Sequence, residues 1–165
     1  MTEGAITQKI LVAGIGNIFL GDDGFGPEVL RHVHPDRPEV RAVDYGIAGM
    51  HLAYDLLDGW DALILVDALP DRGAPGAVHI FAADHESPAA TPGLDAHAMD
   101  PGTVFASLRA LGGTAPHTIV VGCEVGSTAD GIGLTAPVAA AVPGAVGAVE
   151  RVITDLLSGV PSREG

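Results

Sequence analysis

The chain has 165 residues, of which 47% are apolar, and a formal net charge of −13 at pH 7. This length predicts one domain over residues 1–165. The negative charge repels phosphate backbones, which argues against nucleic acid as a partner. We expect no membrane-spanning run and no signal peptide, and the only cysteine, Cys123, cannot form an internal disulfide. These features favour a cytoplasmic protein.

The first part of the chain predicts a strand, a tight loop and a helix. Residues 10–13 form a continuous apolar run, which predicts a buried strand over residues 10–15. A glycine-rich loop with Asp22 and Asp23 follows, and a helix is expected from about residue 26 to 34. Its apolar positions are spaced four apart: Phe25, Val29 and Val33. Because open α/β sheets bind ligands beyond the carboxyl ends of their strands, we expect this loop to supply a metal ligand.

The rest of the chain alternates short apolar strands with helical segments. Strands are predicted at 40–45, 62–66, 78–81 and 118–123, and helices at 50–57, 102–111 and 135–157. Pro143 and Gly144 should kink or break the last helix. The connection before 78–81 is too short for a parallel crossover, so that strand should run antiparallel. The prediction is an α/β fold: a three-layer α/β/α domain with a mixed five-stranded sheet, one strand antiparallel.

Acidic residues follow two of the predicted parallel strands. Asp22 and Asp23 follow the first strand, and Asp67 directly follows the 62–66 run. Strands one and three are often neighbours, which would place these carboxylates at one edge of the sheet. Carboxylates brought together repel each other, and a bound cation removes that repulsion. Among seven histidines, His97 is the best geometric candidate to complete such a site, because it lies in a polar loop just before a helix.

Other protein classes use similar residues but fit less well. A phosphoacceptor receiver domain needs a lysine after the last parallel strand, whereas Lys9 is the only lysine. A dinucleotide-binding loop would have glycine where Phe19 stands. A peptidyl-tRNA hydrolase shares the G-x-G-N turn, but the acidic charge opposes a tRNA substrate. A serine or cysteine hydrolase is also a weak fit, because this chain has no G-x-S-x-G elbow and Cys123 lies in an apolar strand.

Five motifs occur in order along nearly the whole chain: GIGNIFLGDDGFG, DYGIAGM, LILVDALP, DAHAMDP and VVGCE. Together they resemble the nickel–iron hydrogenase maturation endopeptidases. The resemblance implies a mixed five-stranded sheet between helices. It also implies an endopeptidase of the metal-dependent, aspartate type, which removes a C-terminal extension from the hydrogenase large-subunit precursor after nickel insertion. The alternative is a non-catalytic metal-binding or chaperone-like module of the same fold.

The resemblance also implies roles for individual residues. Asp23, Asp67 and His97 match the positions that bind metal, and the two carboxylates also match the catalytic positions. The metal would be nickel, supplied by the precursor, and another divalent metal also suits these ligands. Asp22 is then left to cap the helix that follows the loop.

Two further residues are expected to support the site. Asn17 is expected to bond backbone groups within the first loop, and Asp44 is a candidate supporting residue at the end of strand two. Many family members have D-G-G-T after that strand, whereas this chain has a tyrosine, Tyr45, after Asp44 and lacks the threonine.

Overall fold

The computed structural model describes residues 8–83 and 101–159. Its sheet has five strands: β1 (Ile10–Ile15), β2 (Val40–Gly46), β3 (Ala62–Leu69), β4 (Val78–Ala82) and β5 (His117–Glu124). Their order is β2-β1-β3-β5-β4. Only β4 runs antiparallel, paired with β5, and β1 lies directly beside β3. The predicted mixed sheet, its antiparallel strand and the adjacency of strands one and three are confirmed.

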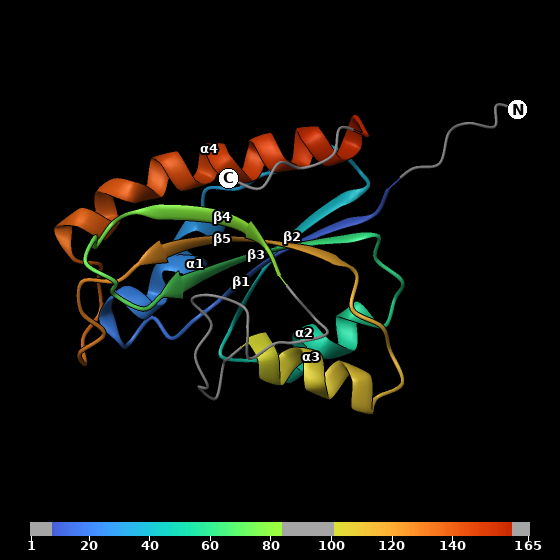
Figure 1. The fold of residues 1–165 in the computed structure, drawn as a ribbon, viewed down its shortest axis with the longest axis horizontal. Helices are drawn as coiled ribbons and strands as arrows, with labels where there is room; N and C mark the ends of the chain where they lie inside the picture. Colours follow the sequence, from blue (N-terminus) through green and yellow to red (C-terminus); the bar gives the residue numbers. More distant parts are fainter. Residues whose placement is uncertain (1–7, 84–100, 160–165) are drawn as a thin grey trace, which may run out of the picture.

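Helices cover both faces of this sheet (Figure 1). On one face lie α1 (Phe25–Leu30) and the long α4 (Ala136–Leu157), and on the other lie α2 (Gly49–Leu56) and α3 (Pro101–Ala110). A short 3₁₀ turn, η1 (Gly21–Gly24), leads into α1. The predicted three-layer α/β/α arrangement is therefore confirmed.

Alternation along the strands divides the core into two clusters. In β3, Ile64 and Val66 pack on the α1/α4 side, while Leu63 and Leu65 pack on the α2/α3 side. Successive side chains of a strand point to opposite faces, so the same alternation assigns a face to each polar residue near a strand end.

Strand β3 is longer than predicted. Asp67 was expected directly after the strand, but β3 continues to Leu69. The reason is that β5 also continues, so that Asp67 pairs with Gly122 and Leu69 with Glu124. Asp67 therefore lies within the paired part of the sheet, where its backbone direction is fixed by hydrogen bonds on the β5 side.

On the α1/α4 face, the end of α1 differs from prediction. Helix α1 ends at Leu30 instead of residue 34. In the turns that follow, N–H groups bond to the carbonyl three residues earlier instead of four, as His32 N–H does to Val29 C=O and Val33 N–H does to Leu30 C=O. Helix α4 is not broken at Pro143. The carbonyl that loses its partner there belongs to Ala139, which is exposed and so accessible to water.

Helix α4 has 22 residues and a mean hydropathy of 1.4 in its most apolar window, which meets the length and composition of a membrane-spanning helix. The sequence prediction that no run is long enough was therefore too strict. In this structure its apolar residues pack in the core instead. One stripe of them is buried against the sheet: Val138, Val142, Ala145, Ala148, Val149, Val152, Ile153 and Leu156. This packing gives the helix the apolar face that a core helix needs.

Gly26 lets α1 pack directly on the ends of β1 and β3. A Cβ atom at this position would lie 2.5 Å from the carbonyl oxygens of both Ile15 and Val66. Real Cβ atoms do not approach backbone oxygens so closely, so any larger residue would push α1 off the sheet edge. Since η1 directly precedes α1, the position of the acidic loop depends on this contact.

We predict that Gly26→Ala destabilises the protein by about 1–3 kcal/mol, because backbone oxygens cannot move aside as side chains do. Gly144→Ala is the matched control, since Gly144 lies exposed inside α4 with nothing within 4 Å of its added Cβ. The control should stabilise the protein by about 0.5–1 kcal/mol. Denaturant unfolding measures both, and equal stability of Gly26→Ala and wild type would refute the close packing.

Candidate functional site

Asp23 is held by the turn that follows β1. Its Oδ2 accepts a 2.7 Å hydrogen bond from the Asn17 N–H, and the Asn17 Oδ1 accepts one of 2.9 Å from the Phe19 N–H. The predicted role of Asn17 within the turn is confirmed. The backbone approaches closely here, since a Cβ on Gly16 would lie 2.0 Å from the Asp23 carbonyl oxygen, and Gly16 has a φ of 145°. The Asp23 carboxylate is half-buried and positioned by its own loop.

Asp22 points inward and is 0% exposed. Its carboxylate accepts four hydrogen bonds, from the N–H groups of Gly126 (2.7 Å), Ser127 (3.0 Å) and Thr135 (2.7 Å), and from the Thr135 hydroxyl (2.7 Å). The prediction that Asp22 caps α1 was wrong, because α1 has no side-chain cap. Asp22 instead ties η1 to the loop after β5 and to Thr135, the residue that precedes α4.

The pKa of Asp22 reflects two opposing effects. Burial alone would raise the pKa, but the hydrogen bonds from Thr135, Ser127 and Gly126 favour the charged form, and the net pKa is lowered from 3.8. The carboxylate is therefore ionised at neutral pH, although it is buried.

Asp67 is 9% exposed, and its Oδ1 accepts a 2.8 Å hydrogen bond from the Ala68 N–H. Alternation from Leu63 and Leu65 places the Asp67 side chain on the α2/α3 face of the sheet. The structure thus presents one strand-end carboxylate from β3 at the carboxyl edge, on a defined face.

Asp44 lies at the same edge but on the other face. In β2, Val43 and Tyr45 pack toward α2 and α3, so Asp44 between them points toward α1 and α4. There it lines an open groove of about 680 Å³, together with Pro27, Glu28 and other residues of α1 and α4. Its Oδ1 accepts a hydrogen bond from the Gly46 N–H at 2.9 Å. The structure therefore does not bring Asp44 together with Asp67.

Asp23 and Asp67 come to the same edge from neighbouring parallel strands. Asp23 belongs to the loop after β1, Asp67 to the last three residues of β3, and Gly26 contacts both strand ends. His97 lies outside the described residues. Within 8–83 and 101–159, no group of three or more His, Cys, Asp or Glu side chains is arranged to hold a metal ion. The two described carboxylates suit a divalent cation chemically, and a metal site would need a further ligand.

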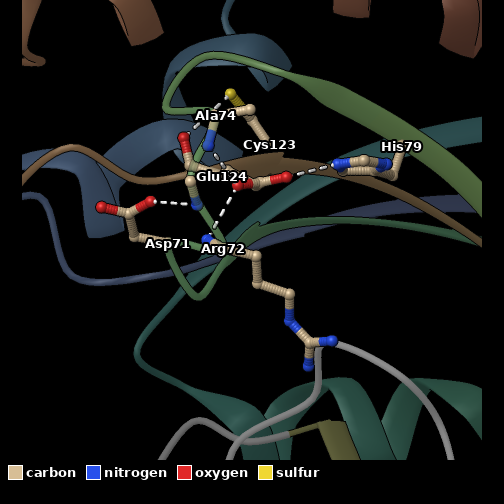
Figure 2. Close-up of polar contacts among 7 residues, drawn as sticks. Asp71, Arg72, Ala74, His79, Cys123 and Glu124 are labelled. Carbon is tan, nitrogen blue, oxygen red and sulfur yellow. Dashed lines mark hydrogen bonds and ion pairs between the residues drawn. The ribbon is translucent and has the colours of Figure 1, made fainter.

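A buried carboxylate that the sequence analysis did not single out is Glu124, at the end of β5 (Figure 2). It is 5% exposed, and its Oε1 accepts hydrogen bonds from the N–H groups of Arg72 (2.8 Å) and Ala74 (3.0 Å). Its Oε2 lies 2.7 Å from Nε2 of His79. The N–H of Arg72, the His79 ring and the N–H of Ala74 all lower the pKa of Glu124. The signal was available, since Glu124, like Asp67, follows an apolar run.

Tyr45, the departure from the D-G-G-T pattern, joins β2 to α2. Its hydroxyl donates a 2.6 Å hydrogen bond to Asp55, and its ring meets the His51 ring edge-on at 5.5 Å. Burial, together with the Asp55 carboxylate, raises the pKa of the Tyr45 hydroxyl well above its ordinary value. The tyrosine is therefore a neutral packing residue in this structure.

Cys123 is buried in the α1/α4 core, and burial raises the pKa of its thiol to about 11. A thiol that stays protonated at neutral pH is a poor nucleophile. The interpretation of Cys123 as an inert core residue is confirmed.

The fold and the acidic strand ends together define an α/β protein with a carboxylate-lined edge. Comparison with known proteins identifies the group. The sequence profile of the family described as HycI, hydrogenase maturation protease, matches residues 27–152, a range that includes Asp67 and begins just after Asp23. The chain belongs to this family of hydrogenase maturation endopeptidases.

Individual relatives agree with this assignment. The chain is 34% identical over 156 residues to the hydrogenase 2 maturation protease of Escherichia coli, which covers 90% of this chain and 91% of that protein. The solved structure of the hydrogenase maturating endopeptidase HybD from E. coli matches with a TM-score of 0.74 at 32% identity, over 90% of this chain and 93% of that one. The chain is also 31% identical over 148 residues to the coenzyme F₄₂₀ hydrogenase subunit delta of Methanothermobacter thermautotrophicus, over 84% of this chain and 90% of that protein.

We predict that Asp22→Asn destabilises the protein by about 2–3 kcal/mol, because the amide NH₂ would face the N–H donors that the carboxylate now satisfies. The matched control is Asp130→Asn. Asp130 is exposed and lies in the loop after β5, the loop that supplies the Gly126 and Ser127 donors to Asp22. The identical change there should alter stability by less than about 0.5 kcal/mol. Denaturant unfolding at pH 7 measures both variants.

The difference in stability between wild type and Asp22→Asn should also depend on pH. Because folding lowers the pKa of Asp22, its contribution is fully present above the unfolded value of 3.8 and is lost as the pH falls through the lower folded pKa. The stability gap between wild type and Asp22→Asn should therefore be constant above about pH 5 and narrow in stronger acid. A gap that widened on acidification would contradict the buried, ionised carboxylate.

Proposed function

We propose that the protein removes the C-terminal extension of a nickel–iron hydrogenase large-subunit precursor after nickel insertion. The proposal rests on its membership in the maturation protease family, combined with Asp23 and Asp67 at one edge of neighbouring parallel strands. In this proposal the nickel belongs to the precursor, and the protein acts in the cytoplasm.

The proposed ligands for that nickel are Asp23, Asp67 and His97. Asp23 and Asp67 are both acidic and lie at one edge of the sheet, at the ends of neighbouring strands, so a divalent cation arriving with the substrate would be favoured there. Asp23 is positioned by Asn17 and Asp67 by the β3–β5 pairing, so both are in place before the substrate arrives. A preorganised ligand pair would recognise a precursor that carries nickel and discriminate against one that lacks it.

Exposed apolar side chains beside Asp23 support a protein as the substrate. Phe19 is 60% exposed and Ile132 is 76% exposed, and Ile18 is exposed as well. Their loops are joined by the bridge between Leu20 and Gly131. Clustered apolar residues on a fixed surface are typical of protein-binding sites.

The alternative is a non-catalytic module that binds the precursor without shortening it. The similarity to a protein described as a hydrogenase subunit, rather than as a protease, is the observation in its favour. The two proposals differ in one product: a shortened precursor and a released peptide, which only an endopeptidase yields.

We predict that Asp23→Asn and Asp67→Asn each lower the rate of precursor cleavage by roughly 100-fold or more, because even the residues behind metal ligands contribute 10–100-fold. The control is Asp36→Asn, which makes the same charge change at an exposed residue before β2. This variant should cleave the precursor at the wild-type rate. Rates are followed by gel or mass analysis of the nickel-loaded precursor.

Folding of each variant is checked by circular dichroism, because a lost fold would also abolish cleavage. Folded Asp23→Asn and Asp67→Asn proteins with wild-type rates would refute the assigned ligands. A wild-type protein that binds the precursor and leaves its mass unchanged would favour the non-catalytic module instead.

A further inference from the structure

The loop between β3 and β4, residues 70–77, is fixed to the end of β5. The Glu124 side chain accepts from the N–H groups of Arg72 and Ala74, and the Glu124 backbone bonds twice more to this loop, from the Gly76 N–H (2.9 Å) and to the Ala77 carbonyl (3.0 Å). Since Glu124 is buried and its carboxylate is shared with His79, the loop is held at several points. Arg72 therefore extends from a well-positioned backbone.

The Arg72 guanidinium takes no part in this arrangement. Only its backbone N–H contacts Glu124, and Figure 2 shows the side chain extending away from that carboxylate, in the direction of α2. Arg72 is exposed, and no hydrogen bond or ion pair of its guanidinium occurs within the described part of the chain. A buried carboxylate that is already satisfied by two N–H groups and His79 leaves the nearby cation available for another group.

The loops at the carboxyl edge of the sheet are acidic apart from Arg72. The loops after β1, β2, β3 and β5 cover residues 16–24, 47–48, 70–77 and 125–135, and Arg72 is the only Lys or Arg among them. The same loops and strand ends carry seven acids: Asp22, Asp23, Asp44, Asp67, Asp71, Glu124 and Asp130. An anionic group of a substrate would be repelled along this edge except where Arg72 offsets the charge.

Arg72 also lies on the side of the sheet that Asp67 faces. Alternation along β5 puts the Glu124 side chain on the α2/α3 face, as it does for Asp67 in β3. Asp67 pairs with Gly122, so Asp67 and Glu124 are separated by one strand spacing and two residues, roughly 8 Å between Cα atoms. An arginine side chain attached beside Glu124 is therefore long enough to reach the space around the candidate ligand Asp67.

We propose that Arg72 is a substrate-binding residue that holds a carboxylate of the precursor, near its cleavage site, beside Asp67. This inference rests on the proposed function. The planar guanidinium presents two parallel N–H donors to a carboxylate, which gives geometric selectivity as well as charge. With the nickel held by the aspartates and a carboxylate held by Arg72, the precursor chain would be fixed at two points and so in one register.

The test compares Arg72→Gln, Arg72→Lys and Arg151→Gln with wild type on the nickel-loaded precursor. Arg72→Gln keeps the backbone N–H that Glu124 needs and should raise KM by about tenfold or more, with a smaller change in kcat. Arg72→Lys keeps the charge but not the paired donors, so its KM should lie between those of wild type and Arg72→Gln. Arg151 is exposed on α4, and Arg151→Gln has the same effect on net charge; it should leave KM unchanged.

A second precursor, with the acidic residues flanking its cleavage site changed to amides, identifies the partner group. For wild type this change should raise KM by about the same factor as Arg72→Gln does, and for Arg72→Gln it should add nothing further. Equal KM values for wild type and Arg72→Gln, or independent losses from the two changes, would overturn the proposal.

Precursor affinity, measured by titration in parallel, separates this proposal from the proposed function. If wild type binds the precursor but never shortens it, the peptidase assignment fails, and the Arg72 effect on affinity still decides the binding role. If wild type neither binds nor shortens it, both proposals are overturned.

Discussion

The buried carboxylate of Asp22 is the interaction on which the arrangement of the site depends. Ionised side chains are rarely fully buried, because the loss of hydration must be offset by hydrogen bonds. Asp22 receives four of them, all from residues more than 100 positions later in the chain. The bonds join the loop after β1 to the loop after β5 and to the start of α4. Asp23, the next residue, takes its place from this anchor and from Asn17.

The second constraint is the alternation of side chains at the carboxyl edge. Asp67 and Glu124 face α2 and α3, whereas Asp44 faces the groove between α1 and α4. Acids that are close in the sheet are thus divided between two faces. Two of these acids serve the framework: Asp22 fixes the loop that carries Asp23, and Glu124 fixes the loop that carries Arg72. Two of the residues proposed to meet the substrate, Asp23 and Arg72, thus lie on loops that buried carboxylates hold in place, whereas Asp67 is held by the pairing of β3 with β5.

Much of the fold follows from short-range patterns. Apolar runs located all five strands, and connection length identified the antiparallel β4. The roles of the acids did not follow in the same way. Asp22 and Asp23 are adjacent in one motif, and the donors that bury Asp22 come from residues 126–135, which no local pattern connects to it. The end of β3 was missed because pairing with β5, not the apolar run, sets its length. The prediction for His97 is untested, since it lies outside the described residues.

We propose that the acidic edge acts on a precursor that already carries nickel. The most direct measurement incubates the purified wild-type protein with nickel-loaded and with nickel-free precursor and weighs the products by mass spectrometry. We expect that only the nickel-loaded precursor loses its C-terminal extension. Unchanged mass under both conditions would contradict the peptidase assignment, and equal shortening of both would contradict recognition of the metal by the two aspartates.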